Sequence, residues 1–130
     1  MRAALGHVDD VTLAVIGLGA WGEGMSTIHG VLSDAERAAV TAAGAVGEAA
    51  GVFFDADGAI VETPLTGRIV GLTGTQLHGI RHVIAIAHGI GKMAAITAAV
   101  RGNLVDSLVT TSETGDALLA AGSAASVIRR

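Results

Sequence analysis

The segment His88-Gly89-Ile90-Gly91-Lys92 carries the residues best suited to binding a ligand. It follows an apolar run and precedes an alanine-rich stretch, so we expect it to connect a strand to a helix. The backbone amides of such a connection and the positive end of the following helix attract an anion, and Lys92 adds a formal charge. A lysine at a helix start is unfavourable against the helix dipole, so it indicates an anionic ligand. The alternative is a solvated lysine at a helix end.

A second candidate segment is Gly17-Leu18-Gly19-Ala20-Trp21-Gly22, which fits the pattern G-x-G-x-x-G. In dinucleotide-binding proteins this pattern opens directly into a helix, whereas here the next helix signal waits until Ser33. We therefore predict no nucleotide cofactor, and expect a glycine loop whose backbone approaches a ligand closely. Ser26 could donate its hydroxyl to that ligand or satisfy local backbone groups. Trp21, the only tryptophan, is expected to be either a core plug or a lid on the site.

Four carboxylates fall in one region of the chain. Glu48 lies inside an apolar run, where a carboxylate is costly unless it meets a partner, so a buried edge or a ligand hydroxyl is expected beside it. Asp55, Asp57 and Glu62 could form a catalytic or metal-binding cluster. The order Asp-x-Asp-Gly is more typical of a tight turn, and we favour the turn.

Several kinds of chemistry have no candidate residues. The absence of cysteine excludes disulfides, zinc-thiolate sites and a thiol nucleophile, and the five histidines show no metal-ligand spacing. No catalytic triad can be assigned and no metal is predicted. A net charge of −4 without a Lys/Arg cluster argues against direct contact with nucleic acid. No uncharged run is long enough to span a membrane and no signal peptide is evident, so we expect a cytoplasmic protein without a membrane partner.

The elements that must position these residues follow from the hydrophobic pattern. The chain has 130 residues, 51% of them hydrophobic, with 19 glycines, which predicts a single domain over residues 1–130. Alternating apolar runs and helical stretches indicate a mostly parallel α/β sheet. Strands are expected at residues 11–16, 46–55, 68–71, 82–87 and 104–111. Helices are expected at residues 34–43, after a capping box at Ser33 and Glu36, and at 75–78, 93–101 and 112–119.

Two details of this pattern concern how the sheet is built. The strand at 82–87 is apolar on both faces, as in strands covered by helices on both sides. The turn at Asp55-Ala56-Asp57-Gly58 should fold residues 59–62 back as a small antiparallel ribbon.

Four sequence blocks resemble a known family in their order and spacing. The blocks are Val15-Ile16-Gly17-Leu18-Gly19-Ala20-Trp21; residues 44–58, Gly-Ala-Val-Gly-Glu-Ala-Ala-Gly-Val-Phe-Phe-Asp-Ala-Asp-Gly; residues 83–96, Val-Ile-Ala-Ile-Ala-His-Gly-Ile-Gly-Lys-Met-Ala-Ala-Ile; and Leu108-Val109-Thr110-Thr111-Ser112-Glu113. Together they closely resemble the SorC family of sugar-binding transcriptional regulators, over nearly the whole chain.

The resemblance implies a fold and a role. The fold would be a Rossmann-like three-layer sandwich, mostly parallel with a small antiparallel ribbon, as in glucosamine-6-phosphate deaminase and ribose-5-phosphate isomerase. The role would be that of an effector domain that binds a phosphorylated sugar and controls homo-oligomerisation and DNA binding. Contact with DNA would come through an N-terminal helix-turn-helix domain, which this chain lacks, so residues 1–130 would be the C-terminal portion of the effector domain.

The resemblance also carries over individual roles. Lys92 matches the family lysine that reaches the ligand, Glu48 matches the acidic residue that faces the sugar, and the loop from Gly17 to Ser26 matches the wall of the site. Two departures are His88, where the family has glycine, and Ser112, where it has aspartate. The ligand-binding residues predicted from the motifs and the resemblance together are Lys92, Glu48, Gly89, Gly91, His88, Gly19, Trp21 and Ser26.

Two rival functions share these features. A sugar-phosphate isomerase or deaminase could have the same fold, and isomerases are expected to carry Asp-Gly-Ala-Asp in a catalytic loop. Here Ile60 follows Asp57-Gly58-Ala59, so the catalytic acid is missing and we predict no enzyme activity. The other rival is an oligomerisation fragment without a ligand of its own, because low charge and an open sheet edge favour self-association.

Overall fold

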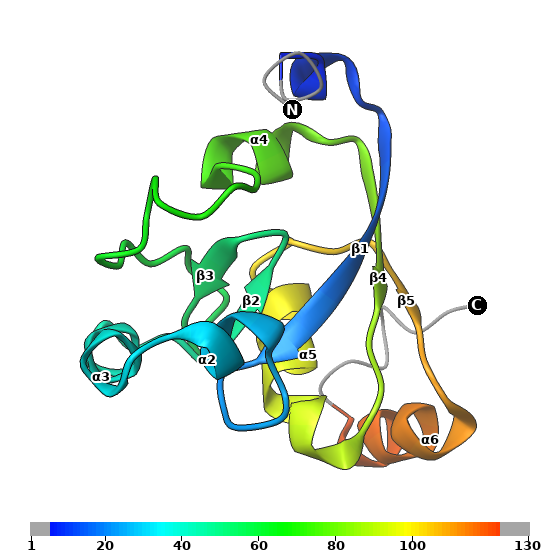
Figure 1. Ribbon diagram of the computed structural model, residues 1–130. Coiled ribbons are helices and arrows are strands. Elements are labelled where there is room, and N and C mark those ends of the chain that lie inside the picture. The colour runs from blue at the N-terminus through cyan, green and yellow to red at the C-terminus, as the bar shows by residue number, and fades with distance from the viewer. Residues whose placement is uncertain (1–5, 123–130) are drawn as a thin grey trace.

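A computed structural model describes residues 6–122 of the chain. The Ser/Ala-rich stretch beyond Gly122, which its composition predicts to be loose, lies outside the described residues. Figure 1 shows the helices and strands along the chain. The elements are η1 (Val8–Asp10), β1 (Leu13–Ala20), α2 (Thr27–Val31), α3 (Asp34–Ala42), β2 (Gly47–Ala49), β3 (Val52–Phe54), α4 (Gly74–Gly79), β4 (His82–Ile86), η2 (Ile90–Lys92), α5 (Met93–Arg101), β5 (Ser107–Val109) and α6 (Ser112–Ala121). No helix of residues 6–122 has the length and apolar character needed to cross a membrane.

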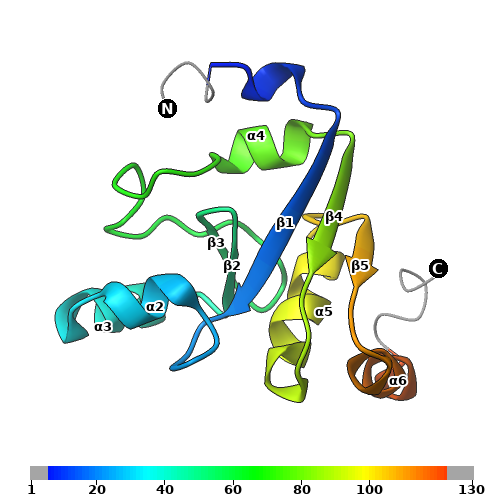
Figure 2. The ribbon, with the colours of Figure 1, turned by 45° about the vertical axis from the view of Figure 1, so that its right-hand side comes forward.

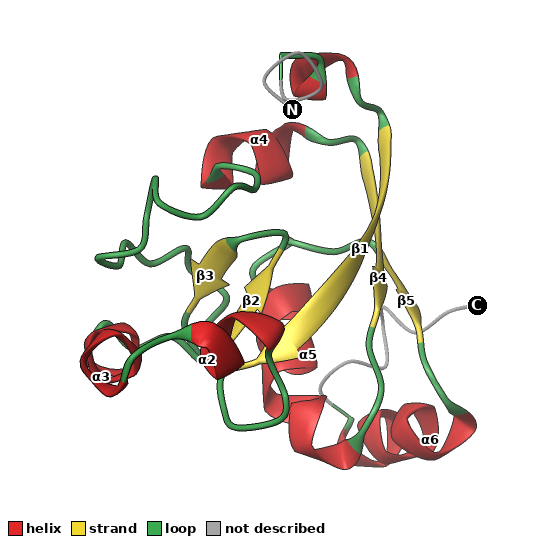
Figure 3. Ribbon diagram, in the orientation of Figure 1, coloured by secondary structure: helices red, strands yellow, loops and turns green. Residues whose placement is uncertain are grey.

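The strands form one mixed sheet in the order β3-β2-β1-β4-β5 (Figure 3). β1 pairs in parallel with β4, and β4 with β5, whereas β1–β2 and β2–β3 are antiparallel. The predicted α/β class is therefore confirmed, but the sheet is mixed and not mostly parallel, because two of its four strand pairings are antiparallel. Helix starts are also specified locally: Ser33 and Glu36 form the predicted capping box, and Thr73 and Gln76 form a second one at α4.

The first strand is longer than predicted. β1 runs to Ala20 rather than stopping at residue 16, so Gly17 and Gly19 belong to the strand and not to a loop. The last three residues of β1 pair with β2, which places Gly19 opposite Glu48. The G-x-G-x-x-G segment therefore begins inside β1. Because its first residues are in a strand, no helix starts directly after its first glycine.

The predicted strand at residues 46–55 is wrong in one respect, because the chain reverses in its middle. Ala50 and Gly51 both have positive φ, 52° and 88°, as a two-residue hairpin turn requires, and they separate β2 from β3. An alanine in a left-handed conformation is uncommon, so the pair Ala50-Gly51 is not a typical hairpin turn.

The next segment confirms the turn and corrects the strands around it. Asp55 accepts hydrogen bonds from the amides of Asp57 and Ala59 through Oδ1, at 2.9 and 3.0 Å, so it acts in a turn. The ribbon predicted at residues 59–62 is reduced to a single bridge between Phe54 and Ile60. The strand predicted at 68–71 does not form, since these residues lie in turns and bends.

The main core cluster lies on one side of the sheet. α5 packs against β1 and β2 and buries Ala95, Ile96, Ala98 and Ala99 in the main cluster, which also holds Val83 and Ala85 of β4. A smaller cluster lies around Val40, Ala45, Phe53 and Leu65, with Trp21 packed against it.

The opposite face of the parallel part of the sheet is largely exposed. The strand register puts four apolar side chains on this face, and their exposed fractions are Leu13 55%, Val15 60%, Ile86 49% and Val109 54%. Figure 2 shows α5 on one side of β4 and β5. The prediction that β4 is covered on both faces is therefore wrong within residues 6–122. In the described residues this second face is covered at β3, where Phe53 packs with Val40 of α3.

Candidate ligand site

The candidate site lies where β1 and β4 end. These strands are parallel, with Gly17 opposite Ile86, so the connections that follow them emerge at one edge of the sheet. Figure 1 shows the loop after β1 beside η2 at this edge. Ligands of open α/β sheets bind outside the carboxyl ends of the strands, which is where this edge lies.

Lys92 reaches from η2 across to β1. Its Nζ donates a hydrogen bond to the Leu18 carbonyl oxygen at 3.3 Å, and the side chain is half-buried. This contact disfavours the alternative of a solvated lysine at a helix end. The single turn of η2 delays α5 until Met93, and Lys92 is the N-cap of α5 without a side-chain capping bond. Its ammonium is therefore held near the strand end by β1.

Glu48 enters the same region from the middle of β2. An ideal Cβ on Gly19 would lie 2.7 Å from Glu48 Oε1, so the missing side chain of Gly19 leaves the space that this carboxylate occupies. Burial raises the pKa of Glu48 above its ordinary value, and the Gly51 amide, the Ser26 hydroxyl and the Lys92 charge oppose this without cancelling it. The site thus holds a desolvated carboxylate beside an ammonium group.

Ser26 and Met25 close the site on the side of the β1–α2 loop. Ser26 is 8% exposed, and its Oγ accepts a hydrogen bond from the His29 amide at 3.3 Å, which makes it the N-cap of α2. Met25 Sδ lies 2.9 Å from where a Cβ on Gly91 would stand, so the methionine bridges the two loops. Sequence reasoning missed Met25, because nothing in its neighbours signals a contact with Gly91.

The loop at 88–92 is less free than predicted. Gly89 has a φ of 109°, and its amide donates to Thr114 Oγ1 at 2.9 Å, so that amide does not face an anion in this structure. Thr114 is 1% exposed. Its contact with Gly89 could not be predicted, because nothing in the sequence marks a threonine inside a helix as a partner of a distant loop. His88 and Gly91 are exposed at the rim. Their roles toward a ligand stay predictions.

Trp21 takes the first of its two predicted roles. The indole packs edge-on against His29 and Phe53, with ring centroids 4.8 and 5.6 Å apart, and its Nε1 donates to Thr41 Oγ1 at 2.9 Å. These contacts place it against the smaller core cluster, beneath the site's loop. The structure thus places Trp21 as a plug, and its role as a ligand contact stays a prediction.

A larger hollow, of about 520 Å³, lies between β3, the 60–74 segment and α4. Its lining is mainly apolar and threonine side chains and includes no lysine or arginine. We place the ligand at Lys92 and Glu48 instead, because a charge and a desolvated carboxylate offer specific contacts there.

The side chains of the candidate site are suited to binding a ligand. Lys92 can donate to an anion, Glu48 can accept from hydroxyl groups, and Ser26 can do both. The serine touches no histidine side chain that could act as its base, since its contact with His29 is to the backbone amide. Among residues 6–122, no group of three His, Asp or Glu side chains is placed to hold a metal ion.

Comparison with known proteins gives consistent results at the level of sequence. Residues 1–120 match the family described as "Putative sugar-binding domain". The transcriptional regulator LsrR of Klebsiella pneumoniae subsp. pneumoniae is 35% identical over 114 residues, which are 85% of this chain and 35% of that protein. The erythritol catabolism regulatory protein EryD of Brucella abortus is 30% identical over 108 residues, which are 82% of this chain and 34% of that protein. The chain thus spans about a third of these relatives.

Solved structures agree with the sequence matches. The full-length sorbitol operon regulator SorC of Klebsiella pneumoniae superposes with a TM-score of 0.81 at 25% identity, over 91% of this chain and 38% of that one. A DeoR family transcriptional regulator of Listeria monocytogenes gives a TM-score of 0.80 at 26% identity, over 90% of this chain and 48% of that one. The fold is thus shared with chains of which it makes up less than half.

Proposed function

This chain belongs to the sugar-binding domain family of SorC transcriptional regulators, and on that premise we propose that it binds a phosphorylated sugar between Lys92 and Glu48. The observation that carries the proposal is that these two side chains, from β2 and η2, both lie against the end of β1, Lys92 at the Leu18 carbonyl oxygen and Glu48 at Gly19. An ammonium group and a carboxylate thus lie in one partly buried region, where burying a charge is costly unless it meets a partner.

The two groups divide the recognition. Lys92 supplies the charge for the phosphate, and its ammonium has two protons beyond the one given to Leu18. Glu48 accepts hydrogen bonds from the sugar hydroxyls. Because the Glu48 carboxylate offsets part of the Lys92 charge, backbone donors must hold the phosphate as well. Gly91, which has no side chain in the way, is placed to bring its backbone close to the phosphate, whereas the Gly89 amide is engaged by Thr114.

The consequence of binding would be regulatory. We propose an effector module of a cytoplasmic regulator, in which the sugar controls homo-oligomerisation and, through a helix-turn-helix domain outside residues 1–130, DNA binding. In this proposal residues 1–130 are the C-terminal portion of that module and catalyse no reaction. The use of Asp55 in a turn and the isoleucine at position 60 support a binding role over an isomerase or deaminase.

The proposal is tested by titrating the chain with sugar phosphates and with the same sugars lacking phosphate, by isothermal titration calorimetry. At least one sugar phosphate should bind, and its unphosphorylated parent should bind at least about tenfold more weakly, since a charge-assisted contact contributes about 1.5–3 kcal/mol. Lys92→Met should reduce this difference, because only the backbone donors would then hold the phosphate.

The matched control is Arg101→Met, which removes one positive charge from the other end of α5, where Arg101 contacts Ala56 and Asp57. This variant should retain the affinity. Equal binding by Lys92→Met and the unaltered chain would contradict the assignment of Lys92, and turnover of ribose 5-phosphate or glucosamine 6-phosphate would contradict the binding role.

A further inference from the structure

We propose that Thr114 of α6 is a positioning residue for Lys92, because its hydroxyl holds the loop from which the lysine reaches the end of β1. This role deepens the proposed function and rests on it for the nature of the ligand. The hydrogen bonds that carry it lie within the chain, so the first test needs no ligand.

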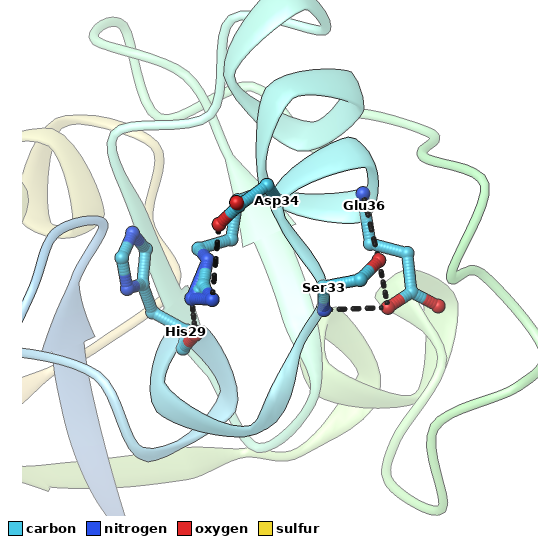
Figure 4. A network of polar contacts seen from close by, with 5 residues as sticks. His29, Ser33, Asp34 and Glu36 are labelled. Atoms are coloured by element: carbon cyan, nitrogen blue, oxygen red, sulfur yellow. Dashed lines mark hydrogen bonds and ion pairs between the residues drawn. The ribbon is translucent and has the colours of Figure 1, made fainter.

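The Thr114 hydroxyl serves another part of the chain rather than its own helix. The cap of α6 is Thr111, whose Oγ1 accepts a hydrogen bond from the Thr114 amide at 3.3 Å. A capping hydroxyl of this kind bonds within its own helix, as Ser33 Oγ does with the Glu36 amide at 3.3 Å (Figure 4). Thr114 Oγ1 instead accepts the Gly89 amide at 2.9 Å, from a loop 25 residues earlier in the chain.

The Thr114 side chain is itself held in place. The residue is 1% exposed, and Thr111 Oγ1 donates a hydrogen bond to Thr114 Oγ1 at 3.0 Å. A hydroxyl oxygen has two lone pairs, so the Gly89 amide and the Thr111 hydroxyl together occupy both. Thr114 Oγ1 is therefore a fixed, buried acceptor for one particular amide.

Gly89 is a residue that needs such an external partner. Its φ of 109° and ψ of 136° lie where glycine is tolerated far better than other residues, and glycine has the most backbone freedom to lose. The bond to Thr114 fixes the Gly89 amide, and the Gly89 carbonyl oxygen accepts the Lys92 amide at 3.0 Å. Both polar groups of the Gly89 backbone are thus engaged, which sets the direction in which the loop enters η2.

The direction of η2 decides what the Lys92 side chain can reach. η2 contacts both β1 and α6, so it lies between the strand end and Thr114. From η2, Lys92 Nζ donates to the Leu18 carbonyl oxygen at 3.3 Å. A lysine whose backbone is fixed has fewer conformations to lose when its ammonium binds a phosphate. Removing the Thr114 hydroxyl should therefore weaken the contacts of the ammonium and spare those of Glu48, which comes from β2.

The first test measures how well Lys92 is held in the chain without a ligand. Lys92 is the only lysine, so acetylation by N-hydroxysulfosuccinimidyl acetate reports its amine, and peptide mass spectrometry separates it from the N-terminal amine. Thr114→Val keeps the branched shape and removes the hydroxyl. It should raise the Lys92 labelling rate about two- to tenfold, the factor to which one hydrogen bond of ordinary net strength corresponds. Thr114→Ser keeps the hydroxyl and should label at the rate of the unaltered chain.

The matched control is Thr63→Val. Thr63 is 8% exposed and its Oγ1 accepts the Leu65 amide at 3.1 Å, so the same substitution removes the same kind of bond outside the site. Amide hydrogen exchange measured by NMR should accelerate at Gly89 only in Thr114→Val and at Leu65 only in Thr63→Val. Both variants should lose thermal stability, but only Thr114→Val should label faster at Lys92. Equal labelling in the two variants, unchanged exchange at Gly89 in Thr114→Val, or a Thr114→Ser chain that labels like Thr114→Val would each overturn the proposal.

The second test adds a sugar phosphate found to bind by calorimetry, together with its unphosphorylated parent. Thr114→Val should bind the sugar phosphate about two- to tenfold more weakly, the range that ordering one long side chain accounts for, and should bind the parent as the unaltered chain does. Thr114→Ser and Thr63→Val should retain both affinities.

Three results of this titration would contradict the positioning role. An equal loss for both ligands would mean general damage to the site, and an unchanged affinity would mean that the bond does not matter for binding. A tighter affinity in Thr114→Val would mean that the freed Gly89 amide serves the phosphate better than a positioned lysine does. If no sugar phosphate binds the unaltered chain, the proposed function fails, while labelling and hydrogen exchange still decide whether Thr114 positions Lys92.

Discussion

The two faces of the parallel part of the sheet have similar side chains and different surroundings. On one face Val83 and Ala85 are 2% and 0% exposed beneath the core, whereas on the other Val15 and Ile86 are 60% and 49% exposed. Both sets are apolar, so the alternation of polar and apolar residues that marks a half-solvated strand is missing. The residue types on both faces of this part of the sheet are therefore suited to burial, but the described chain buries only one of the two faces.

The largest difference in unfolding free energy between the two faces is expected when one isoleucine on each face is replaced by alanine. Ile96 of α5 is fully buried on the core side, so Ile96→Ala should lower the free energy of unfolding by about 2–5 kcal/mol. Ile86→Ala on the other face should lower it by less than about 1 kcal/mol, because half of that side chain is already in water. Urea unfolding measures both, and equal losses would show that the second face is buried in solution.

The next difference concerns how α5 is held over the core face. Gly58 and Gly67 have nearly equal φ, 80° and 82°, but a Cβ on Gly58 would lie 2.1 Å from the Ala98 carbonyl oxygen and one on Gly67 would meet nothing within 4 Å. Gly67→Ala should therefore cost only the backbone strain, about 1–2 kcal/mol. Gly58→Ala should cost about 1–3 kcal/mol more, because backbone must move. Thermal unfolding of the two variants compares them, and equal losses would contradict the close contact.

The strands and helices could be predicted where a single signal decided them. The Ser33–Glu36 capping box and the apolar run of β4 each act locally, and both elements formed where expected. The β2–β3 hairpin could not be predicted, because Ala50 takes its positive φ from the surrounding contacts. The Leu72 amide, for example, donates to the Ala50 carbonyl oxygen.

The site was predictable in part. The motifs and the family resemblance together drew attention to Lys92, Glu48 and Ser26, and the structure brings these three together at the end of β1. Met25 and Thr114 could not be predicted, because their contacts to Gly91 and Gly89 join segments that are far apart in the sequence. The sequence also did not reveal that the Gly89 amide is engaged.

A smaller effect on stability is expected from the ionisation of Glu48, which lies in the candidate site. The pKa of Glu48 is raised by burial, so the folded chain binds this proton more tightly than the unfolded chain does. The contribution of Glu48 to stability is therefore greatest in acid and falls as the pH rises from the ordinary pKa of a glutamate through the raised one. Glu48→Gln cannot titrate, so it should be more stable than the unaltered chain at pH 7, and the gain should vanish in acid. Urea unfolding at several pH values checks the sign, and a Glu48→Gln chain less stable at pH 7 would contradict it.

The smallest effect is expected at the centre of the exposed face. Val15 is 60% exposed, so Val15→Thr should change the free energy of unfolding by no more than about 0.5 kcal/mol at low protein concentration. Its threonine keeps the β-branched shape, so strand propensity is unchanged. At high concentration the outcome depends on the proposed homo-oligomer. If copies associate through this face, the variant should dissociate more readily in analytical ultracentrifugation, and the unaltered chain should gain stability with concentration. A loss above about 1 kcal/mol at low concentration would instead mean that this face is buried within a single chain, and the contrast between the two faces would disappear.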